Sequence, residues 1–121
     1  MICILIADPD SATRKALTLL LRHKLGIIEI VEAQDVETLI CALVDTTPDF
    51  LLLDWRLSGS PAPKTCHLLQ KAYPHLKIVL LSVNDNDAGA AKEAGTMFIH
   101  KGTFPDKLIS TLTLRLQKDK Q

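Results

Sequence analysis

The chain has 121 residues, 47% of them hydrophobic and 23% charged, and its 14 basic residues equal its 14 acidic residues. This length and composition predict one soluble globular domain rather than a disordered or fibrous protein. The net charge of zero gives no electrostatic footprint for nucleic acid or for an anionic membrane, so we expect no direct contact with either. The three cysteines, Cys3, Cys41 and Cys66, fit neither a disulfide framework nor a Cys-x-x-Cys site.

The N-terminal segment and the cysteines favour a cytoplasmic protein. The apolar run Ile2–Ala7 is short, ends at Asp8 and has no basic residue before it, which does not fit a secretory signal peptide. No apolar run reaches the length of a membrane span. Cys3 and Cys41 lie within apolar runs and are expected to pack as small hydrophobic side chains in a reducing compartment.

Along the chain, apolar strand-like runs alternate with segments of helical periodicity. The expected strands are Ile2–Ala7, 27–33, Phe50–Asp54, Lys77–Ser82 and 97–101. The first expected helix is capped by Asp10 or Ser11 and stopped by Gly26. Three further helices are expected over 35–44, 64–73 and 84–94. The last helix is expected to start near Pro105 and to carry Leu108, Ile109, Leu112 and Leu116 on one face.

This alternation predicts an α/β fold of the flavodoxin-like, doubly wound (βα)5 type, with a five-stranded parallel sheet in the order 2-1-3-4-5. No internal repeat, low-complexity tract or domain boundary is visible in the sequence. We therefore expect one domain over residues 1–121, in which the polar tail 117–121 starts a linker to an output domain.

Four of the strand-like runs end at a polar residue that is capable of chemistry: Asp8, Asp54, Ser82 and Lys101. Each has an ordinary explanation when taken alone, as a helix cap, a loop start, a turn residue or a lysine that reaches solvent. Together they fall at the carboxyl ends of parallel strands, which is where ligands bind in open α/β sheets. Asp8 and Asp54 flank the expected switch point and form a carboxylate pair suited to a hard divalent cation. The whole set suits a phosphoryl group.

Five sequence blocks carry a family resemblance. They are ILIAD at 4–8 with Arg14 six residues after Asp8, PDFLLLDW at 48–55, IVLLS at 78–82, EAG at 93–95 and FIHKG at 98–102. No single block is specific, but their order and spacing are. Over essentially its whole length the chain resembles the receiver domain of two-component response regulators.

The resemblance implies a phosphorelay function centred on Asp54. This residue would be the phosphoacceptor, whose carboxylate attacks the phosphohistidine of a sensor histidine kinase or of a phosphotransfer protein. Asp8, Asp54 and the backbone carbonyl of Arg56 would bind Mg²⁺. The domain would not be an enzyme in the ordinary sense, although it would promote its own phosphorylation and dephosphorylation.

The resemblance also implies how phosphorylation is transmitted. Ser82 and Lys101 would bind the phosphoryl oxygens, and Phe98 stands at the position of the family's aromatic switch. Phosphorylation would alter the face built from the fourth helix, fifth strand and fifth helix, which would bind a partner or a second copy of the chain. A fused output domain would then control transcription.

The sequence departs from the family pattern at several positions. Pro9 replaces the second member of the acidic pair, which leaves Asp10 as a weaker candidate ligand and makes Mg²⁺ uncertain. Gly102 replaces the proline that follows the family's lysine, and Ser58 replaces the proline four residues after the phosphoacceptor. Phe98 has no hydroxyl group, so any switching at this position would depend on packing.

Three other features lie near the predicted site. Trp55, the only tryptophan, is expected to cover half of it. His100, one residue before Lys101, is expected to pack beside a helix. The acidic cluster that contains Asp85 and Asp87 is expected to be a solvated helix start.

Two alternative functions remain open. A pseudo-receiver would share the fold and bind partners without being phosphorylated, and Pro9 favours this alternative. A small flavodoxin-like enzyme or nucleotide-binding protein is disfavoured, because the sequence has no glycine-rich phosphate loop and no GxSxG or GxxxxGK motif.

Overall fold

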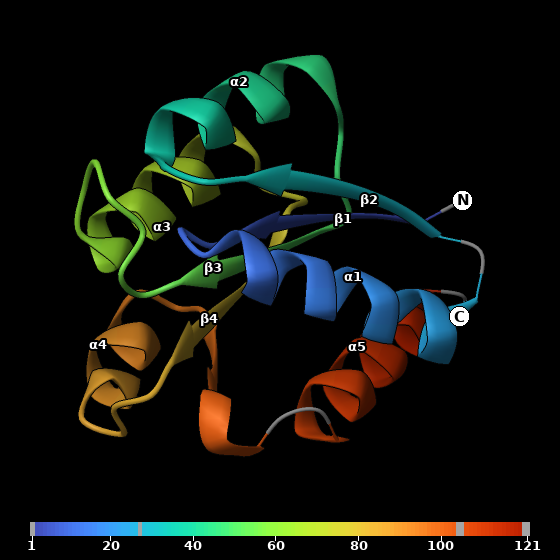
Figure 1. Ribbon diagram of the computed structural model, residues 1–121. Coiled ribbons are helices and arrows are strands. Elements are labelled where there is room, and N and C mark those ends of the chain that lie inside the picture. The colour runs from blue at the N-terminus through green and yellow to red at the C-terminus, as the bar shows by residue number, and fades with distance from the viewer. Residues whose placement is uncertain (1, 27, 104–105, 120–121) are drawn as a thin grey trace.

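The computed structural model describes residues 2–26, 28–103 and 106–119 (Figure 1). Strands and helices alternate along this part of the chain, as the hydrophobic pattern predicts. The strands are β1 (Ile2–Ala7), β2 (Ile28–Ala33), β3 (Phe50–Asp54), β4 (Lys77–Ser82) and β5 (Met97–His100). The helices are α1 (Ser11–Leu25), α2 (Val36–Asp45), α3 (Ala62–Ala72), α4 (Asp87–Glu93) and α5 (Asp106–Asp119), and a short 3₁₀ helix, η1 (Lys101–Thr103), follows β5.

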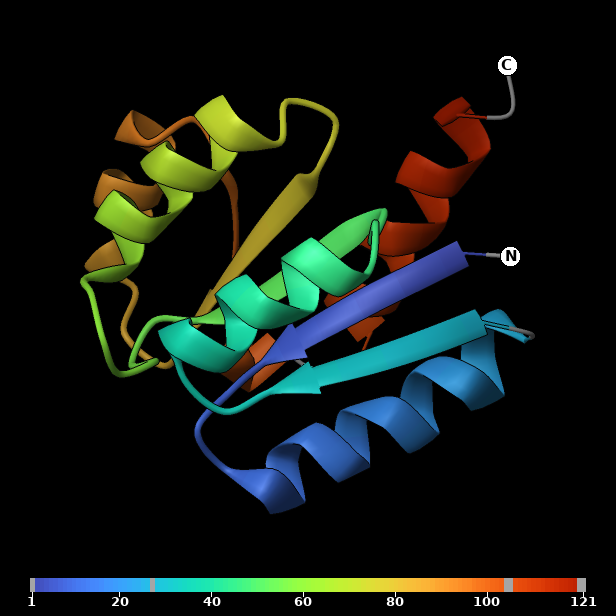
Figure 2. The same cartoon turned by 90° about the horizontal axis from the view of Figure 1, so that it is seen from above.

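The strands form one parallel sheet in the order β2-β1-β3-β4-β5, which confirms the predicted topology. Ala7 pairs with Leu53 of the neighbouring strand, and Ser82 pairs with His100. This register places the carboxyl ends of β1, β3, β4 and β5 at one edge of the sheet. Residues that are far apart in the sequence therefore meet there (Figure 2).

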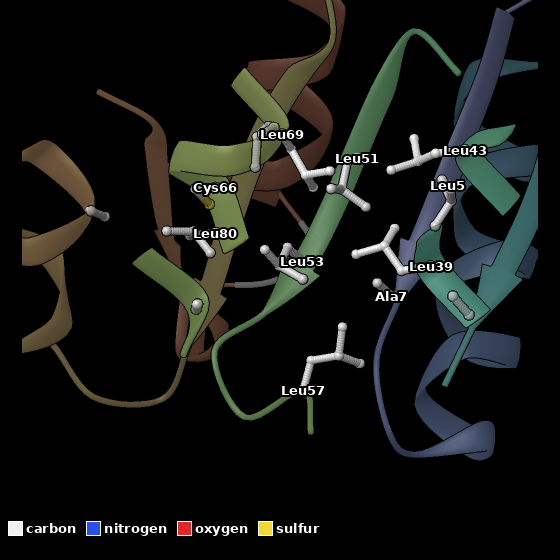
Figure 3. Close-up of a cluster of buried hydrophobic side chains, with 14 residues drawn as sticks. Leu5, Ala7, Leu39, Leu43, Leu51, Leu53, Leu57, Cys66, Leu69 and Leu80 are labelled. Carbon is white, nitrogen blue, oxygen red and sulfur yellow. The ribbon is translucent and has the colours of Figure 1, made fainter. Parts of the chain in front are cut away.

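Alternate side chains of the strands fill two hydrophobic cores, one on each face of the sheet. The α2–α3 core includes Leu5, Leu51, Leu53 and Leu80 from the strands and packs under α2 and α3 (Figure 3). The α1–α5 core lies on the other face; its buried members are Ile4, Ile6, Leu17, Leu21, Ile28, Phe50, Leu52, Val79, Leu81, Ile99, Leu108 and Leu112. Burial on both faces explains why the sequences of β1, β3 and β4 are almost continuously apolar.

Helix-capping residues set the helix bounds. The Asp10 carboxylate accepts a hydrogen bond from the backbone N–H of Ala12 and caps α1, whereas Gly26, with φ of 84°, ends that helix. Asp35 and Thr38 form a capping box at the start of α2. Both ends of α1 therefore lie where the sequence predicts them.

Several predicted bounds differ from the structure. α3 begins at Ala62 rather than at residue 64, because Pro63 lies in the first turn, where its missing N–H costs nothing. α4 is shorter than predicted, since residues 84–86 form a turn before it. β5 ends at His100, because Lys101 already belongs to η1. α5 continues to Asp119, so residues 117–119 of the expected polar tail are helical.

Individual side chains also correct the sequence analysis. Cys3 is buried as predicted, but Cys41 is exposed on α2, and Cys66 is the second buried cysteine. The predicted contribution of residue 27 to β2, the role of Pro105 and the burial of Leu116 lie outside the described residues and side chains. Among residues 2–26, 28–103 and 106–119, no helix is long and apolar enough to cross a membrane.

Candidate functional site

Lys101 joins two buried carboxylates at the carboxyl edge of the sheet. Its Nζ donates to Oδ2 of Asp8 at 3.2 Å and to Oδ2 of Asp54. The Lys101 side chain is 15% exposed, and both aspartates are buried. β1, β3 and the residue after β5 thus bring three predicted site residues into one cluster.

The second oxygen of each aspartate is bound by backbone. Oδ1 of Asp8 accepts from the N–H of Asp10 at 2.8 Å, and Oδ1 of Asp54 accepts from the N–H of Arg56 at 2.7 Å. A buried charge is tolerated only when it is paired and hydrogen-bonded. Both carboxylates meet this condition, and both side chains are held in one orientation.

The two carboxyl groups differ in their affinity for a proton. Burial, together with the negative charge of Asp54, raises the pKa of Asp8 against the opposing effects of the Asp10 N–H and Lys101. Burial also acts to raise the pKa of Asp54, but the hydrogen bonds from Lys101 and from the Arg56 N–H outweigh it and lower that pKa. Asp54 is therefore the carboxylate that stays ionised more readily.

Arg14 holds the backbone of β1 beside this cluster. Its Nη1 donates to the carbonyl oxygen of Asp8 at 2.6 Å, and its Nε donates to Glu32 at 3.0 Å. In the sequence, Arg14 stands out only by its position six residues after Asp8. In the structure this spacing places the guanidinium one helical turn into α1, within reach of the end of β1.

Ser82 lies at the same edge, but its hydroxyl group is bound to a residue that the sequence analysis overlooked. It donates to Oδ2 of Asp87 at 2.6 Å and accepts from the N–H of Asn84 at 3.1 Å. Asp87 was expected to belong to a solvated helix start. The contact forms through the turn that precedes α4, in which the Asp87 N–H also donates to the carbonyl oxygen of Asn84, and the helix prediction over 84–94 does not include this turn.

A small pocket opens between these elements. It is lined by Asp54, Trp55, Arg56, Ser82, Val83 and Lys101. Trp55 is half-buried, in agreement with its expected position over the site. Phe98 is also half-buried and packs against the α2–α3 core below the end of β5. The predicted phosphoryl-binding residues therefore surround one cavity.

Two side chains near the site have contacts that the sequence does not predict. The Nε2 of His100 lies 2.7 Å from the carbonyl oxygen of Val83, in the loop after β4. The Asp10 carboxylate accepts from Thr13 Oγ1 at 2.6 Å and from Ala12 N at 3.3 Å, so it faces α1 rather than Asp54. Among the described residues, no group of three or more His, Cys, Asp or Glu side chains could hold a metal ion.

The sequence model of the response regulator receiver domain matches residues 4–113. The chain belongs to this family. The receiver is 28% identical over 118 residues to the sensory transduction protein LytT of Bacillus subtilis, covering 98% of the chain and 49% of LytT. It is 24% identical over 120 residues to the phosphate regulon transcriptional regulatory protein PhoB of Pseudomonas aeruginosa, covering 95% of the chain and 52% of PhoB. The receiver thus spans about half the length of these curated relatives.

Solved structures show the same fold. A two-component response regulator from Clostridium difficile superposes with a TM-score of 0.89 at 21% identity, covering 100% of both chains. The response regulator protein TrrA from Thermotoga maritima, in complex with Mg²⁺ and beryllofluoride, gives a TM-score of 0.83 at 22% identity, covering 93% of the receiver and 97% of TrrA. At these identities the similarity establishes the architecture of the receiver.

The receiver offers oxygen ligands, which suit a hard cation, but it offers few of them. Asp8 and Asp54 supply carboxylate oxygens from adjacent strands, and the carbonyl of Arg56 is a third oxygen in the same loop. Mg²⁺ commonly uses one or two protein carboxylates and completes its shell with water and phosphate oxygens. The Lys101 ammonium already binds Oδ2 of both carboxylates, so a cation would share these oxygens with it or use the Oδ1 atoms.

Proposed function

We propose that the receiver accepts a phosphoryl group on Asp54 from a phosphohistidine of a sensor histidine kinase or a phosphotransfer protein. The observation that carries this proposal is the Lys101 ammonium bound to both Asp8 and Asp54, with Ser82 on the rim of the same pocket. A cation, a nucleophile and a hydroxyl group at one strand edge provide the positioning and charge neutralisation that phosphoryl transfer requires.

In the proposed reaction, a carboxylate oxygen of Asp54 forms a bond to phosphorus as the bond between phosphorus and the donor's imidazole nitrogen breaks. The electron pair of the broken bond leaves with the imidazole. The lowered pKa of Asp54 keeps this weak nucleophile ionised. Lys101 then pairs with a phosphoryl oxygen in place of the carboxylate charge that Asp54 loses when it is phosphorylated.

Asp8, Asp54 and the backbone carbonyl of Arg56 are the residues that would hold Mg²⁺. The ion would supply positive charge to the phosphoryl oxygens during transfer. Asp10 is left out of this set because its carboxylate caps α1. The proposal therefore includes a two-carboxylate metal site, in which Pro9 provides no ligand.

The proposed output is a change of the surface formed by α4, β5 and α5. The Ser82 hydroxyl group would give up its hydrogen bond to Asp87 and bind a phosphoryl oxygen instead. Phe98 would then repack into the space that this movement opens. The altered surface would bind a partner or a second copy of the chain in the cytoplasm. Because one curated relative is named a transcriptional regulatory protein, a fused output domain that controls transcription is part of the proposal.

Incubation with acetyl phosphate and Mg²⁺, followed by intact-protein mass spectrometry, tests the proposal. Wild type should gain the mass of one phosphoryl group, and Asp54→Asn should gain none. Asp45→Asn is the matched control, since Asp45 is an exposed carboxylate at the far end of α2 and should not affect labelling. An unlabelled wild type, or equal labelling of Asp54→Asn, would contradict the proposal.

A pseudo-receiver is the second candidate function, and the orientation of Asp10 favours it. Because Pro9 follows Asp8 and the Asp10 carboxylate is bound to α1, the proposed Mg²⁺ site has one acidic residue fewer than the family pattern. A Mg²⁺ titration followed by Trp55 fluorescence separates the two functions, because Trp55 lines the pocket with Asp54. A saturable change that Asp8→Asn abolishes supports the phosphoacceptor; no change up to high Mg²⁺ supports the pseudo-receiver.

A further inference from the structure

The His100 ring connects the two loops that carry the proposed phosphoryl-binding residues. Its Nε2 lies 2.7 Å from the carbonyl oxygen of Val83, the residue directly after Ser82. Its Nδ1 accepts a hydrogen bond of 2.8 Å from the backbone N–H of Gly102, the residue directly after Lys101. One side chain thus bridges the end of β4 and the start of η1.

These two contacts are compatible with a single protonation state. A carbonyl oxygen only accepts, so Nε2 must carry the hydrogen in its contact with Val83. The Gly102 N–H only donates, so Nδ1 must be unprotonated. The pair of contacts therefore requires the neutral Nε2–H tautomer. Asp85 Oδ1 lies 3.9 Å from Nε2, and its side chain is 87% exposed.

Gly102 is the residue that makes room for the ring. A Cβ atom at this position would lie 2.8 Å from both Cε1 and Nδ1 of His100. The φ of Gly102 is not positive, so its backbone would accept any residue and only the ring demands glycine. A proline would, in addition, lack the N–H that Nδ1 accepts.

We propose that His100 is a positioning residue that fixes Ser82 and Lys101 relative to one another, with Gly102 as its obligate partner. In this receiver the His100–Gly102 pair fixes the conformation of the segment after β5, in which the family pattern has a proline at position 102. The inference rests on the proposed function for the roles of Ser82 and Lys101. The bridge itself does not depend on phosphorylation.

The first test measures the tautomer in the wild-type protein by ¹⁵N NMR of the histidine rings. His100→Asn identifies the His100 signals by their loss. We expect a protonated Nε2 and an unprotonated Nδ1 for His100 at neutral pH, with a coupling path to the Gly102 amide. An Nδ1–H tautomer, or a ring that interconverts between both, would overturn the proposal.

The second test is a double-mutant cycle of His100→Ala and Gly102→Ala, read as melting temperature. Gly102→Ala alone should lower the melting temperature, because the new Cβ displaces the ring. In the His100→Ala background the same substitution should leave it unchanged or raise it, since alanine restricts the unfolded chain more than glycine does. Equal effects in both backgrounds would show that the ring does not demand glycine, and would refute the pairing.

The third test separates positioning from mere structural support. His100→Asn offers an acceptor near the Nδ1 position and should retain most of the acetyl phosphate labelling rate, whereas His100→Leu keeps bulk without an acceptor and should lower that rate about tenfold. Equal rates in the two variants would contradict the positioning role. If wild type is not labelled at all, the proposed function fails, and the tautomer and the cycle still decide whether the bridge exists.

Discussion

At the scale of single residues, the site holds two buried carboxylates close together, which is electrostatically unfavourable. Asp8 and Asp54 are buried side by side and share one ammonium group, so two negative charges face one positive charge. The raised pKa of Asp8 shows that its charged form is disfavoured, while that of Asp54 is favoured. Functional sites commonly trade folding stability for such an arrangement.

Asp8→Asn should therefore make the receiver more stable at neutral pH. Because folding raises the pKa of Asp8, the native state binds this proton more tightly than the unfolded chain, and ionisation of Asp8 works against folding as the pH rises above the unfolded value of 3.8. The asparagine variant cannot ionise and should gain about 1 kcal/mol in the free energy of unfolding at neutral pH.

Urea unfolding at several pH values measures this gain. The difference between Asp8→Asn and wild type should shrink as the pH falls below 3.8, where Asp8 is protonated in both states. Asp45→Asn controls for the loss of one exposed charge. A variant that is less stable than wild type at neutral pH would show that pairing with Lys101 outweighs the cost of burying Asp8.

A second residue-scale prediction concerns the competition for the Ser82 hydroxyl group. Asp87 Oδ2 accepts a hydrogen bond of 2.6 Å from this hydroxyl group, and a bound phosphoryl group would have to take the place of Asp87. Asp87→Ala should tighten binding of beryllofluoride with Mg²⁺ by about threefold to tenfold, the value of one net hydrogen bond. Fluorescence titration of Trp55 gives the dissociation constants, with Glu93→Ala at the other end of α4 as control. Unchanged or weaker binding would argue against this competition.

At the scale of elements, α4 is the shortest of the described α-helices. It has only seven residues, its N-cap residue Asn86 makes no side-chain cap, and Gly89 lies in its interior. Short helices are marginal without packing, and glycine lowers helix stability further. α4 also carries Asp87, so we expect the helix that moves in the proposed switching to have little intrinsic stability.

Gly89→Ala should stabilise the receiver by about 0.5–1 kcal/mol, because a Cβ atom at Gly89 meets nothing within 4 Å and the backbone there is helical. Thermal unfolding measures the gain, and amide hydrogen exchange should show slower opening of α4. Gly26→Ala is the matched control: it also meets nothing within 4 Å, but its φ of 84° makes alanine cost about 1–2 kcal/mol. Equal effects of both substitutions would contradict this account.

The same elements show what a sequence can and cannot predict. The sequence locates the inner strands β1, β3 and β4 to within a residue or two because both of their faces are buried, which makes the apolar runs continuous. α4 was placed too early, since the segment 84–94 is rich in Asn, Asp, Ala and Gly and has no clear apolar period. The predicted helix 64–73 leaves out Pro63, although proline also fits a first helical turn.

The convergence of Asp8, Asp54, Ser82 and Lys101 followed from topology alone, because parallel strands end at one edge. Their partners did not follow. Asp87 reaches Ser82 through the turn before α4, and His100 at the end of β5 reaches Val83 after the neighbouring strand β4. The first contact depends on the conformation of that turn and the second on the pairing of β4 with β5. The sequence allows the Asp10 carboxylate to face either α1 or Asp54, and the start of α1 decides between them.

At the scale of the whole molecule, one sheet couples two cores. Adjacent residues of β3 point to opposite faces: Leu52 packs into the α1–α5 core and Leu53 into the α2–α3 core. Because the same strands complete both cores, neither core should be able to unfold while the other stays native. A domain of this size is therefore expected to unfold in one cooperative step.

Leu52→Ala and Leu53→Ala test this coupling from the two sides of one strand. Both side chains are almost completely buried, so each truncation should cost about 2–5 kcal/mol. Leu68→Ala, at a side chain that is 55% exposed on α3, should change stability by less than about 0.5 kcal/mol. In both core variants the urea transitions followed by Trp55 fluorescence and by far-ultraviolet circular dichroism should coincide. Separate transitions in either variant would mean that the core on one face of the sheet unfolds before the other. The sheet edge that carries Asp54 would then be supported by the remaining core alone.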